Sequence, residues 1–454
     1  MSLPSLRPYQ VEDVAFLSQR QTAGIFNEQR TGKTPTAIAT IQEWKSKKYL
    51  VVCPASAIPV WTDAINKWSP TTATTELVGT KIKRQKLLDN WTAGAAIISY
   101  GCLKTTAKGE GLVSQLLSHK PDAIIFDEAH RIKDPKSAQA KAAFACNKIP
   151  QRLVLTGTPA SGKPEEIFSL LKIIDPKQFS SYWRFIENYF RTRQAFGAGG
   201  RSYIDIIGFQ PGKEQELQQY LATCSVQRKR KDVMPWLPPK DYIDIKLHPT
   251  AIQQRHLKEL KEFFETEHVI TQGILDRLIR YRQICLNPAL LGLQHSSPKQ
   301  EWVLQFLEDY PDSVLIFSKF TSFLLRLQEA LQKEKYATGV IVGATSLIDR
   351  AKQVAAFQAG KLRVLLVNID AGKEALTLDR AESTIFLDQY PPASDIQQAE
   401  DRFVATTPDK ANKPHKIYRL MMKGTYDEQI YKLIEQRASA IDLLNDYHKY
   451  LKGV

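Results

Sequence analysis

Two series of short apolar runs divide this sequence, and within each series the runs are separated by segments of helix length. The first series occupies residues 23–27, 49–53, 95–100, 123–127 and 152–156, and the second occupies residues 314–317, 339–342, 364–368, 384–387 and 416–421. Strands that alternate with helices are typical of a doubly wound parallel sheet. We therefore predict an α/β chain with two doubly wound lobes, and 454 residues suffice for a separate core in each lobe.

The remaining sequence predicts two insertions and a linker. We expect the first lobe to span residues 1–163, with a helical, aromatic-rich insertion at residues 164–226. Residues 227–240 combine a basic run with prolines, which oppose regular structure, so this segment is predicted to link the lobes. Residues 241–285 are predicted to form a second helical insertion, and residues 286–454 are predicted to form the second lobe.

The net charge of the chain indicates the class of its partner. A charge of +14 favours a polyanion, with nucleic acid first and an acidic membrane surface second. No run approaches the ~18 apolar residues that a membrane span requires, and the first residues resemble no secretion signal, so we expect a cytoplasmic protein without a membrane. The five cysteines lack the spacing of a zinc site and are expected to be reduced and mostly buried.

Residues 31–34, Thr-Gly-Lys-Thr, follow the first predicted strand and precede a predicted helix. In this context, backbone N–H groups and the helix N-terminus can bind phosphates. Lys33 would neutralise the charge of the β- and γ-phosphates, and the Thr34 hydroxyl would bind Mg²⁺. The pattern GxxxxGK[ST] is incomplete because Asn27 stands at its first glycine, so an ordinary helix start is the alternative.

Two adjacent acids, Asp127 and Glu128, directly follow the predicted strand at residues 123–127. Open parallel sheets bind ligands at the carboxyl ends of their strands. Asp127 can hold Mg²⁺, and Glu128 can orient or deprotonate the water that attacks the γ-phosphate. Helix capping is the alternative function of this acidic pair, and a simple turn is the alternative for residues 155–159, which close the next strand.

Residues 398–402, Gln-Ala-Glu-Asp-Arg, follow a predicted strand of the second lobe. Arg402 could stabilise the charge on a transferring phosphoryl group, a contribution of roughly 10³ to 10⁵ in rate. The alternative is an ordinary ion-pair face on a helix.

Taken in this order, these residues resemble the SNF2 family of superfamily 2 helicase-like, DNA-dependent ATPases, from Leu6 to about Ile434. The segments that are similar to family motifs are residues 6–10, 127–133, 155–159, 228–240, 282–291, 315–320, 343–357 and 398–402. The resemblance implies two RecA-like lobes with ATP and Mg²⁺ as cofactors.

The resemblance also implies roles for individual residues. ATP would be bound by Arg7, Gln10, Arg30, Thr31, Gly32, Lys33, Thr34, Gly372, Gln398 and Arg402. Lys33, Glu128 and Arg402 would act in catalysis, while Thr34 and Asp127 would hold Mg²⁺. Double-stranded DNA would be bound without sequence preference by Ser99, Tyr100, Lys319 and Thr345, although burial of the Tyr100 ring is an alternative.

We therefore expect a monomer that moves along duplex DNA without separating its strands, alone or with a protein partner. A strand-separating or branch-migrating helicase is one alternative. A nucleotide-dependent DNA-binding subunit that hydrolyses ATP weakly is another. The sequence departs from the family pattern at Arg30, where a glycine is usual, in the glycine-poor residues 371–378, and at Ala405, where a second arginine is expected. The form around Arg30 is similar to that of phage and bacterial members.

Overall fold

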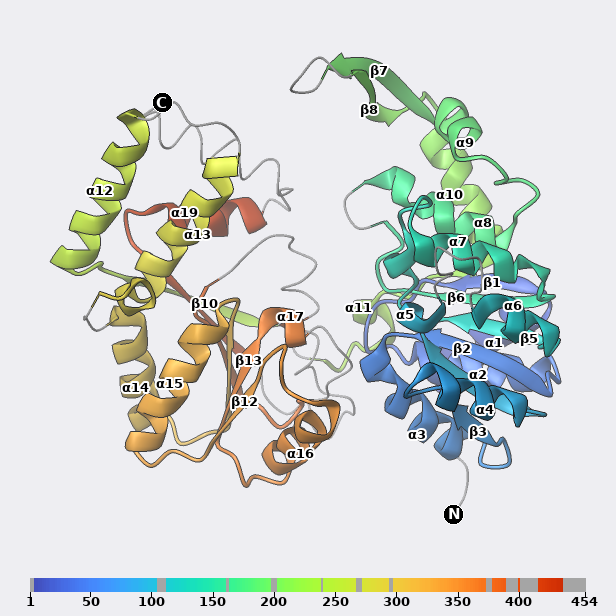
Figure 1. Cartoon of the computed structure of the whole chain (residues 1–454), viewed down its shortest axis with the longest axis horizontal. Coiled ribbons are helices and arrows are strands. Elements are labelled where there is room, and N and C mark those ends of the chain that lie inside the picture. Colours follow the sequence, from blue (N-terminus) through green and yellow to red (C-terminus); the bar gives the residue numbers. More distant parts are fainter. Residues whose placement is uncertain are drawn as a thin grey trace. The chain divides into compact units, whose positions relative to one another are not determined.

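The computed structural model describes residues 4–103, 112–160, 163–196, 202–237, 240–266, 272–293, 297–372, 378–388, 399–400 and 415–435. The chain divides into two compact units, Met1–Pro235 and Trp236–Val454. Each unit is built on a parallel β-sheet with helices beside it (Figure 1), which confirms the predicted α/β class. No helix in the described ranges combines the length and the apolar character needed to cross a bilayer.

The main sheet of the first unit has the strand order β3-β4-β2-β5-β6-β1-β9, and all its neighbouring strands are parallel. Its strands are β1 (Thr22–Ile25), β2 (Lys48–Cys53), β3 (Thr74–Glu76), β4 (Gly94–Ser99), β5 (Ala123–Phe126), β6 (Gln151–Leu155) and β9 (Ser225–Val226). β4 and β5 are buried along their whole length, as expected of parallel strands that are covered on both faces. Parallel strands end at the same edge, so the segments that follow β1, β5 and β6 emerge together.

Helices surround this sheet. They are α1 (Pro8–Ser18), α2 (Lys33–Glu43), α3 (Ile58–Trp68), α4 (Lys81–Asp89), α5 (Tyr100–Leu103), α6 (Leu112–Ser118), α7 (Ala138–Ala145), α8 (Phe168–Ile174), α9 (Tyr182–Tyr189), α10 (Lys213–Cys224) and α11 (Arg230–Val233). Short 3-10 helices are η1 (Ala55–Ala57), η2 (Ala129–Ile132), η3 (Cys146–Lys148) and η4 (Pro164–Ile167). The cysteines are all unpaired, and only Cys102 is not fully buried.

The insertion of the first unit is only partly helical. Around α8 to α10, aromatic residues such as Phe179, Phe185 and Tyr189 pack into one buried cluster. Between α9 and α10, β7 (Phe190–Phe196) and β8 (Ser202–Phe209) form an antiparallel hairpin that extends away from the main sheet (Figure 1). The insertion at residues 164–226, predicted to be helical, therefore contains a hairpin in addition to its helices. The strand Ser202–Phe209 is rich in isoleucine and aromatic residues, which suit a strand better than a helix.

The second unit contains a six-stranded sheet in the order β10-β15-β14-β11-β13-β12, again with parallel neighbours. Its strands are β10 (Asp241–Leu247), β11 (Val314–Ser318), β12 (Thr338–Ile341), β13 (Val364–Asn368), β14 (Ser383–Phe386) and β15 (Lys416–Met422). Its helices are α12 (Ala251–Thr266), α13 (Gln272–Leu286), η5 (Pro288–Leu291), α14 (Pro298–Asp309), α15 (Thr321–Lys333), α16 (Leu347–Gln358), α17 (Ile369–Gly372) and α19 (Tyr426–Glu435).

The segment 241–285 was predicted to be helical, but it begins with the edge strand β10, which pairs with β15. Along β10, Tyr242, Asp244 and Lys246 are exposed, while the alternate residues Ile243 and Ile245 are partly buried against the core. This two-residue period is typical of a half-buried strand. The period was present in the sequence, and the prediction missed it because the helices that follow dominate the segment.

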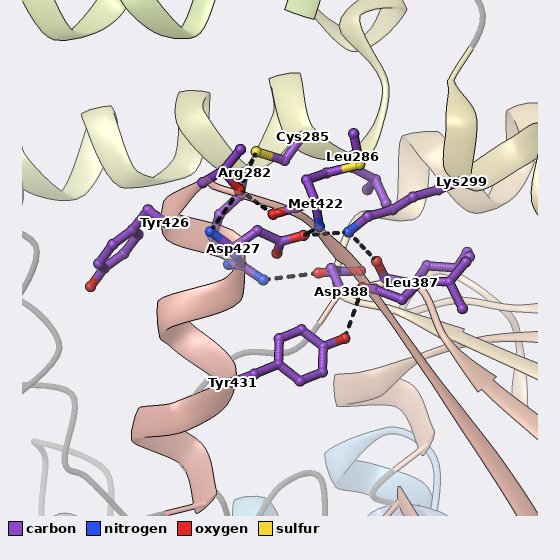
Figure 2. Close-up of polar contacts among 12 residues, drawn as sticks. Arg282, Cys285, Leu286, Lys299, Leu387, Asp388, Met422, Tyr426, Asp427 and Tyr431 are labelled. Carbon is purple, nitrogen blue, oxygen red and sulfur yellow. Dashed lines mark hydrogen bonds and ion pairs between the residues drawn. The ribbon is translucent and has the colours of Figure 1, made fainter. Parts of the chain in front are cut away.

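Two buried ion pairs connect the elements of the second unit (Figure 2). Arg282 of α13 donates to Asp388 at 2.8 Å, and Lys299 of α14 donates to Asp427 of α19 at 2.7 Å. The four side chains are at most 4% exposed. Lys299 Nζ also donates to the backbone oxygen of Leu387 at 2.7 Å, so it joins the end of β14 to the start of α19.

We predict that Lys299→Met lowers the free energy of unfolding of the second unit by about 3–5 kcal/mol, because it leaves the Asp427 carboxylate buried without its cation. Lys352→Met is the matched control, since the Lys352–Asp349 pair is mostly exposed and its loss should cost at most about 0.5 kcal/mol. Urea unfolding of the full chain, followed by hydrogen exchange in β14 and β15, measures both effects. Equal stability of the two variants would contradict the importance of the buried pair.

Candidate active site

The candidate phosphate loop, residues 30–34, lies between β1 and the first turn of α2. Gly32 has a φ of 82°, and a Cβ atom at this position would lie 2.2 Å from the side-chain nitrogen of Gln10. Only glycine fits such a close approach with a positive φ. No side chain caps the N-terminus of α2. Its first N–H groups therefore remain suitable donors for phosphate oxygens.

Lys33 is held over the backbone that leads into this loop. Its Nζ atom donates to the backbone oxygens of Asn27 at 3.0 Å and Glu28 at 3.3 Å, and the Thr31 hydroxyl donates to the same Glu28 oxygen at 2.7 Å. Carbonyl oxygens are weaker partners for an ammonium group than anionic phosphate oxygens. The lysine can therefore exchange these contacts for a phosphate.

Arg30 has a φ of 67°, a left-handed conformation that is uncommon for residues other than glycine. This is the position at which the family resemblance predicts a glycine. The backbone thus keeps a conformation suited to glycine, at a cost on the order of 1–2 kcal/mol. Such strain clusters at ligand-binding sites.

The start of α1 is bonded to the same loop. Gln10 accepts a hydrogen bond from the backbone N–H of Arg7 at 2.8 Å, and its side-chain amide donates to the backbone oxygens of Thr31 at 3.3 Å and Gly32 at 3.2 Å. The Tyr9 hydroxyl donates to the Thr31 oxygen at 2.7 Å. Gln10 therefore braces the phosphate loop in this structure, and its contact with ATP, like that of Arg7, stays a prediction.

Asp127 follows β5 and is held by two donors. The Glu128 backbone N–H donates to one oxygen of its carboxylate, and Trp61 Nε1 donates to the other, both at 2.9 Å. Removal from water and, next, the adjacent Glu128 charge raise the pKa of Asp127 to about 6, against the opposing effects of the Trp61 hydrogen bond and the Lys33 ammonium. The opposing effect of Lys33 means that the loop lysine and this carboxylate lie within electrostatic reach of each other.

Glu128 occupies a strained position beside the turn that follows β6. Its φ of 49° is left-handed. Its carboxylate lies 3.3 Å from Nδ1 of His130, and this nitrogen lies 3.3 Å from the Thr156 hydroxyl. A Cβ atom at Gly157 would lie 3.6 Å from Lys33 Nζ, so the three segments after β1, β5 and β6 meet around one small space.

These groups fit Mg-ATP. The site offers an uncapped helix N-terminus and an ammonium group for the phosphates. The Thr34 hydroxyl and the Asp127 carboxylate are oxygen ligands of the kind that Mg²⁺ prefers, and magnesium sites commonly use one or two protein oxygens plus phosphate oxygens. Glu128 supplies a carboxylate that can accept a proton from water.

A cavity of about 680 Å³ lies next to this site in the first unit. Pro8, Tyr9 and Glu12 line one side, and residues 227–229 and 231–233 line the other. Since the Tyr9 hydroxyl contacts the phosphate loop at Thr31, the cavity is a suitable place for the base and ribose of a nucleotide whose phosphates bind the loop.

The two predicted DNA contacts of the first unit lie mostly below the surface. Tyr100 is 2% exposed, and its hydroxyl donates to the backbone oxygen of Asp127 at 2.8 Å. Ser99 is 9% exposed. The alternative of a buried Tyr100 ring therefore describes the structure, because the ring fills the core beneath the acidic pair and its hydroxyl finds a partner there. Tyr100 thus positions Asp127 instead of presenting its ring to a DNA backbone.

In the second unit, the residues predicted to contact DNA, Lys319 and Thr345, lie after the ends of β11 and β12. The backbone N–H of Lys319 donates to Asp388, which also accepts from the Ser318 hydroxyl, and the Lys319 ammonium pairs with Asp370. The Thr345 hydroxyl accepts from the backbone N–H of Val342 at 3.0 Å. Gly372 ends α17, while Gln398, Arg402 and Ala405 lie outside the described residues.

Sequence reasoning missed three residues of the site. Trp61 was assigned only to the core, yet its indole N–H binds Asp127. A buried tryptophan usually needs a partner for its N–H, and this was the available signal. Asn27 was noted only as a departure from a glycine, although its side chain donates to the buried Asp13 at 2.8 Å. No signal in the sequence connected His130 with Thr156.

Comparisons with known proteins identify the family of this chain. Residues 9–290 match the sequence model of the SNF2-related domain, and residues 298–404 match that of the Helicase conserved C-terminal domain. The chain is 26% identical over 452 residues to the DNA annealing helicase and endonuclease ZRANB3 of Bos taurus, covering 95% of this chain and 40% of that protein.

It is also 25% identical over 463 residues to the Chromodomain-helicase-DNA-binding protein 1-like of Danio rerio, covering 94% of this chain and 42% of that protein. The chain thus spans about two fifths of the length of these curated relatives. Among solved structures, the Sulfolobus solfataricus SWI2/SNF2 ATPase core in complex with dsDNA is 21% identical with a TM-score of 0.45, covering 95% of this chain and 91% of that one.

We predict that Lys33→Ala abolishes both ATP binding and turnover, because it removes the cation at the phosphates. Glu128→Gln should keep nucleotide binding and lower turnover by about 10²- to 10⁴-fold, the usual contribution of a general base. Binding of a fluorescent ATP analogue and phosphate release measure the two steps separately.

Glu43→Gln, at the exposed end of α2, is the control for loss of a carboxylate and should leave both steps unchanged. A Glu128→Gln protein with normal turnover would remove the catalytic assignment of Glu128.

Proposed function

Because this chain belongs to the SNF2-related family, we propose that it is a DNA-dependent ATPase that couples hydrolysis of Mg-ATP to movement along double-stranded DNA. The observation that carries the proposal is the meeting of Lys33, Asp127 and Glu128 at one edge of the first sheet. A loop lysine beside an acidic pair that follows another strand of the same sheet has the groups needed for γ-phosphate hydrolysis.

The residues of the first unit divide the chemistry among them. The α2 N-terminus and Lys33 bind the phosphates, and Thr34 and Asp127 hold Mg²⁺. Mg²⁺ held there would supply positive charge to offset the charge that develops on the phosphates. Glu128 orients the attacking water and accepts its proton, and Nδ1 of His130 lies 3.3 Å from the Glu128 carboxylate and 3.3 Å from the Thr156 hydroxyl.

Three observations support duplex DNA as the partner. The chain carries a charge of +14, both curated relatives named above have DNA in their names, and Lys319 presents a partly exposed ammonium at the end of β11. Backbone contacts from Lys319 and Thr345 would make binding independent of sequence and sensitive to salt. We propose a monomer as the acting species.

Arg402 is proposed to supply the arginine that stabilises the transferring phosphoryl group. Ala405, where a second arginine is expected, favours a second candidate function, a nucleotide-dependent DNA-binding subunit that turns ATP over weakly until a partner acts. The departure at Arg30 supports a phage or bacterial source, although the two relatives named above are animal proteins.

We predict that duplex DNA stimulates ATP hydrolysis more than single-stranded DNA or RNA does. The protein should also displace the third strand of a DNA triplex and leave the underlying duplex closed, because movement on duplex requires no strand separation. Phosphate release with each nucleic acid and gel analysis of the triplex measure the two outcomes. Equal stimulation by RNA, or efficient unwinding of a forked duplex, would favour the helicase alternative.

We predict that Arg402→Ala lowers turnover by about 10³-fold and leaves nucleotide binding nearly intact, because such an arginine acts on transition-state charge. Ala405→Arg should raise the low intrinsic rate. Single-turnover hydrolysis and nucleotide titration measure these effects. Unchanged turnover in Arg402→Ala would mean that the arginine lies elsewhere, and a wild-type protein that is active only with an added partner would favour the subunit function.

A further inference from the structure

The last segment of the first unit runs beside the strand that leads into the phosphate loop. β9 pairs with β1, with Gly24 opposite Ser225 and Ile25 opposite Val226. The backbone bonding continues past both strands, because the Phe26 N–H donates to the Val226 oxygen at 2.8 Å and the Glu28 N–H donates to the Arg228 oxygen at 3.0 Å. We call residues 228–235 the connector, since they precede Trp236, where the second unit begins.

Glu28 bonds to the connector a second time. Its carboxylate accepts a hydrogen bond at 2.8 Å from the backbone N–H of Arg230, the first residue of α11. Glu28 is therefore a donor to the connector through its backbone and an acceptor from it through its side chain. The bond to a carboxylate is charge-assisted and stronger than an ordinary backbone hydrogen bond.

The same residue also touches the lysine of the site. The Glu28 carbonyl accepts from Lys33 Nζ at 3.3 Å and from the Thr31 hydroxyl at 2.7 Å. A phosphate bound at Lys33 competes for the ammonium group and weakens its hold on this carbonyl. The position of the Glu28 peptide unit therefore depends on whether a phosphate is bound at the loop.

A buried anchor holds the neighbouring residues in place. Asp13 is fully buried and binds Arg228 of the connector at 2.8 Å on one oxygen and Asn27 at 2.8 Å on the other. Asn27 is the other residue whose backbone oxygen accepts from Lys33. The connector is thus bonded to Asn27 through Asp13 and to Glu28 directly. The backbone oxygens of both residues accept hydrogen bonds from Lys33.

We propose that Glu28 is a positioning residue that transmits occupancy of the phosphate loop to the connector, and so to the chain that enters the second unit. This inference rests on the proposed function, because it requires a phosphate at Lys33. In this structure, Glu28 fixes the start of α11. Binding of a nucleotide shifts the Glu28 peptide and loosens the Arg230 amide.

The test is hydrogen exchange of peptides that cover residues 226–235, measured on the full chain with and without saturating Mg-ADP or a non-hydrolysable ATP analogue. In wild type, nucleotide should speed exchange in the connector roughly fivefold, as expected for the loss of one hydrogen bond. Glu28→Ala should exchange at the faster rate already without nucleotide and should respond no further.

Glu28→Gln keeps an oxygen that can accept from the Arg230 N–H, so it should restore the slow exchange and the response to nucleotide. If Glu28 had only a structural role, its replacement would change the exchange rate of the connector but not the response of that rate to nucleotide. Glu43→Ala, the same substitution at an exposed site, is the control and should behave as wild type.

The outcomes separate this inference from the proposed function. A wild-type protein that binds neither nucleotide would overturn both. A wild-type protein that binds nucleotide with no change of exchange in the connector would overturn the coupling alone. A Glu28→Ala protein that responds as wild type does would also overturn it, because the signal would then not pass through Glu28.

Discussion

The pairing of β5, β6 and β1 is the constraint on which the candidate site depends. In this register Phe126 lies opposite Val154, and Ile25 lies opposite Leu155, so the three strands end at nearly the same level. The acidic pair and the hydroxyl of the next turn directly follow β5 and β6, and the loop lysine begins α2, the helix that follows β1. Parallel hydrogen bonding thus brings together residues that lie about a hundred positions apart.

Buried carboxylates then fix the backbone that carries the site residues. A carboxylate removed from water must be compensated by donors, and the donors become oriented as a result. Asp13 holds Asn27 and the connector arginine in the first unit, and burial raises its pKa although these partners oppose the rise. Asp388 holds the Lys319 backbone in the second unit. In each unit, therefore, a buried acid that is not expected to contact a ligand positions a residue that is expected to contact one.

The predictions from sequence succeeded where a signal is local and periodic. The apolar runs located ten strands to within about two residues but missed β3, β7, β8, β9 and β10, and the acids lie directly after β5 and the lysine at the start of α2. They failed where a residue's role depends on a distant partner. Tyr100 and Trp61 both have aromatic rings in the core, and only the position of Asp127 shows that their polar ends meet it. Likewise, the composition of residues 228–231 indicates only a linker, and the pairing of β9 with β1 shows that this basic run follows a strand of the first sheet.

The sequence by itself determined the α/β class, the two sheets and the candidate phosphate-binding and acidic residues, because hydrophobic period and strand endings are local properties of the chain. Only the tertiary structure decided that Glu28 bonds to the connector and that Gln10 braces the phosphate loop. It also decided that the insertion contains a hairpin. The reason is physical, since a hydrogen bond between residues some two hundred positions apart depends on the order in which strands join a sheet, and that order is set by the packing of the whole unit.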